Sequence, residues 1–138
     1  MDTLTCRIVR PDKQLYEGAA ESMTLVTRTG ELGVLPKHSA EICALGDGVM
    51  RVKRSADEGG ETERVVISGG YAEISDNTVI VLADHARNID DIDADRVSEV
   101  RAEAVSNRDA IPEGDHARAY YEGKIHWCDL LLKEATEA

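Results

Sequence analysis

The sequence has no phenylalanine, one tryptophan and four tyrosines, so aromatic residues make up only 4% of its 138 positions. A folded core must therefore be built from aliphatic side chains, and 42% of the residues are hydrophobic. No apolar run approaches the roughly 20 residues that a membrane-spanning helix needs. Polar Asp2 and Thr3 follow the first methionine, where a signal peptide would lead into an apolar segment. We expect one compact domain with a small appendage, without a signal peptide and without direct lipid insertion.

Cysteine is scarce as well. Cys6, Cys43 and Cys128 are odd in number, far apart and without Cys-x-x-Cys spacing, which argues against a disulfide framework and against a zinc ribbon. The four histidines form no ligand pair of the His-Glu-x-x-His kind. We therefore expect three buried, reduced thiols and no metal. The histidines stand at positions 38, 85, 116 and 126.

Positive charge is also in short supply, because 27 acidic residues face 16 basic ones and the net charge is −11. This balance argues against a nucleic-acid backbone or an anionic membrane as a direct partner. The charge is uneven along the chain. Residues 84–138 carry 14 acidic and 7 basic residues, net −7, while residues 1–83 carry 13 and 9, net −4.

Motifs of catalysis are absent. Ser68 lacks the preceding glycine of a Gly-x-Ser-x-Gly nucleophile elbow. Gly46 and Gly48 lack the third glycine and the following helix of a dinucleotide-binding loop. We therefore expect no active site in this chain.

Residues 3–83 contain short runs typical of β-strands, separated by turn residues. Asp47-Gly48 is a strong hairpin signal, Gly69-Gly70 is expected to break a strand, and Ser75-Asp76-Asn77 is a turn. Many short strands at roughly ten-residue spacing predict a β-sandwich or a flattened barrel. The expected strands include Leu15–Gly18, Ser22–Thr27, His38–Leu45, Val49–Arg54, Arg64–Ser68, Tyr71–Ile74 and Thr78–Ala83.

After Ala83 the apolar residues recur at helical spacing. Asp90 or Asp91 is expected to cap a first helix, and Asp115 a second one after a Pro-Gly break. Two antiparallel helices joined by a short turn form a hairpin. The predicted fold class is α+β, mainly β, with a β-sandwich domain at residues 1–87 and a helical hairpin at residues 88–138.

The segment from Thr29 to His38 is expected to form a rigid, shaped loop. Gly30 and Gly33 permit backbone angles that other residues resist, and Pro36 fixes its own φ. The loop presents one outward carboxylate, that of Glu31. Charged turn residues are usually exposed and inert, but the shape of this loop indicates a docking edge rather than a reaction centre.

Four motifs follow one another along the chain. They are Gly30-Glu31-Leu32-Gly33-Val34-Leu35-Pro36-x-His38, Gly48-Val49-Met50-Arg51-Val52, Ile67-Ser68-Gly69-Gly70 and Val81-Leu82-Ala83-Asp84. Their order and spacing resemble the ε subunit of F-type ATP synthases. The resemblance extends from about residue 3 to the end of the chain and is stronger in the β domain. It implies a ten-stranded β-sandwich followed by a helical hairpin, in a non-catalytic subunit of the central stalk.

The resemblance also implies partners and a location. Gly30, Glu31 and Gly33 match the loop that contacts the c-ring of Fo, and His38 and Gly48 match positions on the side that faces the γ subunit. Such a subunit clamps γ to the c-ring, couples proton flow to ATP synthesis, and lies peripherally at the cytoplasmic face of the bacterial cell membrane. Its helical tail can reach the α and β subunits and regulate ATP hydrolysis.

The stretch from Ile92 to Val97 resembles a pattern by which some bacterial ε subunits bind ATP, with Ile92, Asp93 and Arg96 as the matching residues. ATP would be a weak regulatory ligand, and no other cofactor is expected. Val97 stands where alanine is usual, nearby acids repel a triphosphate, and an ordinary helix start explains Asp93 and Arg96 equally well.

The tail from Asp115 onwards is itself acidic, so we expect the hairpin to inhibit hydrolysis weakly or not at all. Two alternatives to the stalk subunit remain at this point. One is a small ATP-sensing regulatory domain, and the other is a free-standing β-sandwich that binds other proteins.

Overall fold

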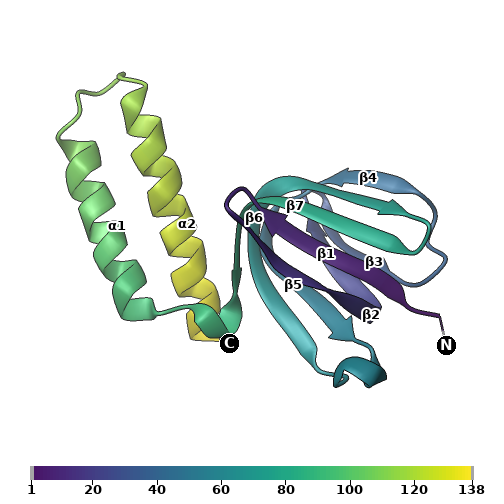
Figure 1. The fold of residues 1–138 in the computed structure, drawn as a ribbon. Helices are drawn as coiled ribbons and strands as arrows, with labels where there is room; N and C mark the ends of the chain where they lie inside the picture. Colours follow the sequence, from purple (N-terminus) through teal and green to yellow (C-terminus); the bar gives the residue numbers. More distant parts are fainter. Residues whose placement is uncertain (1, 138) are drawn as a thin grey trace. The chain divides into compact units, whose positions relative to one another are not determined.

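Seven strands and two α-helices account for most of the chain in a computed structural model that describes residues 2–137 (Figure 1). The chain divides into two units, Met1–Asn88 and Ile89–Ala138. The first unit holds all the described strands and the second both α-helices, so the predicted α+β, mainly β class is confirmed. The strands are β1 (Leu4–Arg10), β2 (Lys13–Thr27), β3 (Gly30–Val34), β4 (Glu41–Ala44), β5 (Asp47–Arg54), β6 (Thr62–Ser75) and β7 (Thr78–Asn88).

The strands follow the order β1-β7-β6-β5-β2-β3, with β4 paired to β6. A further pairing of β1 with β2 closes the path on itself. Alternation of apolar and polar residues directs one face of each strand inward, as in β1, where Leu4, Cys6 and Ile8 are buried. The core is aliphatic, as the lack of phenylalanine requires. Its largest members include Leu4, Ile8, Met23, Leu25, Leu45, Met50, Ile67 and Ile74.

The implied strand number of ten is wrong for residues 2–137, where seven strands occur because expected neighbours fuse. Strand β2 covers both Leu15–Gly18 and Ser22–Thr27, with a register shift between Ala20 and Ser22. Strand β6 runs straight through Gly69-Gly70, where the sequence predicted a break. A Cβ on Gly70 would collide with the carbonyl oxygen of Leu82, so glycine serves close packing against β7 here.

The run expected from His38 to Leu45 is shortened to β4, because the chain first completes a turn in which His38 N donates to Leu35 O. Lys37 adopts a positive φ of 72° in this turn. A short 3-10 turn, η1 (Ala56–Glu58), joins β5 to β6. Among the described strands, β3 pairs only with β2 and β4 pairs only with β6, so both lie at open edges of the sandwich.

The second unit begins with a 3-10 turn, η2 (Ile89–Asp91), followed by α1 (Ala94–Asp109) and α2 (Ala117–Glu137). The expected cap at Asp90 or Asp91 is wrong. Asp93 is the N-cap, since its carboxylate accepts from the backbone N–H of Arg96, which closes the first turn. At the second start, Asp115 accepts from the N–H of Ala117. The two helices contact each other as a hairpin (Figure 1).

Candidate functional site

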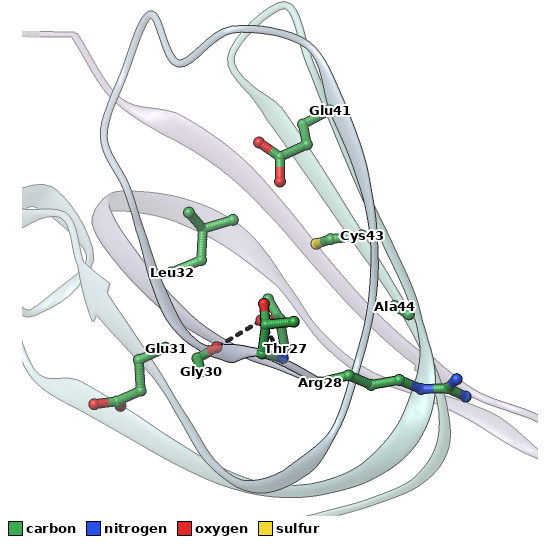
Figure 2. A pocket seen from close by; sticks show the side chains of 9 residues that line it. Thr27, Arg28, Gly30, Glu31, Leu32, Glu41, Cys43 and Ala44 are labelled. Atoms are coloured by element: carbon green, nitrogen blue, oxygen red, sulfur yellow. Dashed lines mark hydrogen bonds between the residues drawn. The ribbon is translucent and has the colours of Figure 1, made fainter.

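The candidate docking loop is fixed by its own hydrogen bonds. The Thr27 hydroxyl donates to the carbonyl oxygen of Gly30 at 2.6 Å, across the turn between β2 and β3 (Figure 2). Gly30 has a φ of +132°, a conformation that favours glycine. Strand β3 then pairs antiparallel with β2 and anchors the loop through buried Val34. Gly30, Glu31 and Gly33 therefore lie within strand β3, where the sequence predicted a loop, on a backbone held by these contacts. We call residues 27–34 the docking loop.

Glu31 is exposed but has a partner. Its Oε2 lies 3.1 Å from Nη1 of Arg51 on β5, with the two side chains 57% and 45% exposed. Strand β2 lies between them, since Glu31 is opposite Val26 and Arg51 is opposite Thr24. Sequence reasoning placed Arg51 in a motif without giving it a role. Its alternation with buried Met50 and Val52 was the available signal that it faces outward.

A hollow of about 250 Å³ opens beside the loop, lined by residues 27–32 and by Glu41, Cys43 and Ala44 of β4. Leu32 and Cys43 also pack against the hydrophobic core. Figure 2 shows the side chains of Glu31 and Arg28 directed away from the hollow, on opposite sides of it. The wall is therefore partly apolar, and charged groups stand at the rim.

The thiol of Cys43 offers no reactive group in this hollow. Burial raises the pKa of the thiol, and the nearby carboxylate of Glu41 raises it further. A protonated thiol is a poor nucleophile and a poor metal ligand. Across residues 2–137, no cluster of three or more His, Cys, Asp or Glu side chains could hold a metal ion.

The two residues matched to the γ-facing side lie in different surroundings. His38 is half-buried in the turn before β4, and its Nδ1 lies 2.7 Å from the carbonyl oxygen of Ser39. Gly48 is the second residue of β5, where an added Cβ would lie 3.1 Å from Cγ1 of Val26. Packing against β2 is therefore sufficient reason for glycine at position 48, and the structure does not bring it together with His38.

A surface that sequence reasoning missed lies on the outer face of β4, β6 and β7. Ile42 is 72% exposed, Tyr71 59% and Leu82 56%. Tyr71 pairs directly with Leu82 on one side and with Ala44 of β4 on the other, and Ile42 of β4 pairs with Glu73, two residues after Tyr71 on β6. We call Ile42, Tyr71 and Leu82 the apolar stripe. Large exposed apolar residues that adjoin one another mark interaction sites.

The residues matched to an ATP-binding pattern are occupied by the start of α1. Asp93 caps the helix, and Nη1 of Arg96 lies 3.3 Å from Oε2 of Glu99. Arg96 and Glu99 are both about two-thirds exposed, and Ile92 is half-buried. The structure brings Asp93 and Arg96 together through a backbone contact, so their guanidinium and carboxylate do not form a shared nucleotide cradle.

Neither helix within residues 2–137 combines the length and the apolar character that crossing a membrane requires.

Comparison with known proteins assigns the fold. Residues 3–89 match the family described as ATP synthase, Delta/Epsilon chain, beta-sandwich domain. The chain is 40% identical to the ATP synthase epsilon chain of Pediococcus pentosaceus over 96% of its length and 89% of that relative's. It is 37% identical to the ATP synthase epsilon chain of an Exiguobacterium species, over 98% and 92% of the two lengths.

Among solved structures, the chain resembles one in the Euglena gracilis mitochondrial ATP synthase, described as OSCP/F1/c-ring in rotational state 1. The TM-score is 0.67 at 27% identity, and the match covers 99% of this chain and 82% of the other. Sequence and fold agree over nearly the whole length, helical hairpin included. The chain belongs to the ATP synthase delta/epsilon chain family.

Proposed function

We propose that this chain is a non-catalytic subunit of the central stalk of ATP synthase, which joins the γ subunit to the c-ring and so couples proton flow to ATP synthesis. The family membership carries this proposal. The similar Euglena chain belongs to an assembly of F1 with a c-ring, which supports the same place for this chain. The role is mechanical: torque passes through the subunit only if both contacts hold.

The docking loop provides the c-ring contact in this proposal. Gly30, Glu31 and Gly33 lie on a platform held by the Thr27 hydroxyl and by β-pairing, so little order is lost when a partner binds. An exposed carboxylate at the rim of a partly apolar hollow can fix the register of a polar partner loop.

The apolar stripe provides the γ contact. In a chain of net charge −11, three large apolar side chains that are each more than half exposed on adjacent strands mark a protein interface. His38 lies in the turn that leads into β4, the strand that carries Ile42. Gly48 stays a prediction as a γ contact, with packing against Val26 as its structural explanation.

Co-purification tests the γ contact. Tyr71→Glu is expected to abolish recovery of γ with the tagged full-length chain, because the carboxylate would be desolvated at the interface. Tyr120→Glu is the matched control, since Tyr120 on α2 is 66% exposed and lies outside the stripe. Equal recovery of γ with both variants would refute the stripe as the γ contact.

Proton pumping tests the ring contact. Glu31→Lys is expected to lower ATP-driven proton pumping by the assembled synthase while ATP hydrolysis continues, because the docking charge is reversed. Unaltered pumping would exclude Glu31 from the coupling contact. A free-standing binding module, the alternative to a stalk subunit, would recover no γ even as the unmodified chain.

The hairpin is expected to regulate hydrolysis weakly. Its arginines are engaged within the hairpin, as in the pairs of Arg96 with Glu99 and Arg101 with Asp129, so little free positive charge remains for an acidic partner. Deletion of residues 88–138 should therefore leave the ATPase activity of the assembled enzyme almost unchanged. A strong rise in activity would show that the tail inhibits.

A further inference from the structure

The ion pair between Glu31 and Arg51 connects strands that are not neighbours. Glu31 lies on β3 and Arg51 on β5, and both strands pair with β2 between them. Oε2 of Glu31 is 3.1 Å from Nη1 of Arg51. No described residue pairs with Oε1 of Glu31. The carboxylate therefore leans over β2 with one oxygen engaged and one available.

The neighbour of Arg51 on its other side favours this direction. Arg64 on β6 is directly opposite Arg51 in the β5–β6 pairing, and like charges in such positions repel. Arg64 is exposed and has no ion-pair partner among residues 2–137. Repulsion from Arg64 and attraction to Glu31 both move the guanidinium of Arg51 across β2, toward the docking loop.

We propose that Arg51 is a positioning residue for rotor docking: it holds the Glu31 carboxylate so that its free oxygen accepts from a hydrogen-bond donor on a polar loop of the ring. The inference rests on the ring contact proposed above. The loop backbone is already fixed, so the rotamers of Glu31 are the main freedom left. If a long side chain is already restricted before binding, less conformational entropy is lost when the partner binds.

The strength of the pair agrees with this role. Both side chains are about half exposed, and such surface pairs are weak. A weak pair biases a rotamer without withdrawing the carboxylate from an incoming donor. We therefore expect loss of Arg51 to reduce docking about two- to fivefold, not to abolish it.

The test measures the affinity of the full-length chain for ATP synthase that lacks this subunit, with the ring present or with F1 alone. The variants are E31Q, R51Q, the double variant E31Q/R51Q and R51K. R108Q is the matched control, since it removes the same charge and breaks an ion pair with Asp109 on α1, in the other unit of the chain. Thermal unfolding confirms that each variant is folded.

Support consists of a similar loss of affinity for E31Q, R51Q and the double variant, confined to the ring-containing complex, with R108Q unchanged and R51K losing less affinity than R51Q. If R51Q binds like R108Q while E31Q is weakened, the inference fails and the proposed ring contact stands. If the fold-loss of affinity in the double variant equals the product of the fold-losses in the two single variants, Arg51 acts independently of Glu31, and the inference is also overturned. Unchanged binding of E31Q would refute the ring contact itself, and the inference with it.

Discussion

Nε of Arg101 on α1 lies 2.5 Å from Oδ1 of Asp129 on α2, which makes this pair a direct polar link between the two helices of the hairpin. The contact raises the pKa of the Arg101 guanidinium, chiefly through the hydrogen bond to Asp129. A second link lies at the turn, where Nη1 of Arg118 donates to the carbonyl oxygens of Arg108 and Ile111 at the end of α1. Cations suit this end of a helix.

Arg101→Gln is expected to loosen the hairpin, because only a few apolar residues of α1, such as Val97 and Ala104, are buried. The resulting decrease in the melting temperature of the hairpin should be smaller at high salt, since exposed ion pairs are screened. Trp127 on α2 is the only tryptophan of the chain, and its fluorescence during thermal unfolding reports on the hairpin.

The control for the hairpin is Arg96→Gln, which removes the same charge from a pair that lies within α1. If the two variants melt at the same temperature, the link between the helices does not stabilise the hairpin.

Gly70→Ala should strongly destabilise the β domain. The added Cβ would collide with the carbonyl oxygen of Leu82, and the φ of +110° resists a side chain. We expect a loss of about 3 kcal/mol or more in the free energy of unfolding. Urea unfolding followed by circular dichroism measures it.

Gly33→Ala is the matched control for Gly70→Ala, because a Cβ on Gly33 meets nothing within 4 Å. Its effect should stay within about 1 kcal/mol. Equal losses for the two variants would contradict the packing explanation of Gly70.

Sequence periodicity was sufficient for the element types, because alternation in the strands and helical spacing after Ala83 are local signals. It could not decide where strands fuse. Gly69-Gly70 is typical of a break, and only the proximity of Leu82 on β7 shows that the strand continues. The cap of α1 was similarly undetermined, since four aspartates lie between residues 90 and 95 and any of them suits a helix start.

The candidate site was predictable in part. The glycines and the proline around Glu31 indicate the backbone conformation there, and the motif that contains Glu31 can be recognised because its residues are consecutive in sequence. Arg51 is twenty positions from Glu31, and their pairing depends on β2 lying between β3 and β5. The apolar stripe likewise requires β4 and β7 to flank β6, which brings together Ile42, Tyr71 and Leu82 from distant parts of the chain.

Cys6 should make the β domain sensitive to alkaline pH. The thiol is buried in β1, and burial raises its pKa from 9.0 to about 12. The Cys6 thiol of the unfolded chain ionises at the lower pKa. Its contribution to the free energy of unfolding is therefore fully present below pH 9.0 and is lost as pH rises toward 12. The expected slope is about 1.4 kcal/mol per pH unit in that window.

Urea unfolding of the unmodified chain and of Cys6→Ala, at pH values from about 8 to about 11, isolates this slope. The alanine variant should start less stable, because it leaves a small cavity, and should lose stability less steeply. Half-buried Tyr16 is present in both proteins; burial raises its pKa and the charge of the Cys6 thiolate raises it further, so the comparison measures Cys6 together with its coupling to Tyr16. Parallel curves would show that the Cys6 thiol does not contribute.

The chain should not bind ATP measurably. Asp93 is used as the cap of α1 and Arg96 pairs with Glu99, so a nucleotide would have to compete with contacts that the helix already makes. Asp90, Asp91 and Asp95 add negative charge where a triphosphate would lie. Calorimetry with millimolar ATP should therefore detect no heat of binding beyond dilution. A binding isotherm that Arg96→Ala abolishes would instead establish the alternative of an ATP-sensing domain, and would show that the first turn of α1 rearranges around the nucleotide.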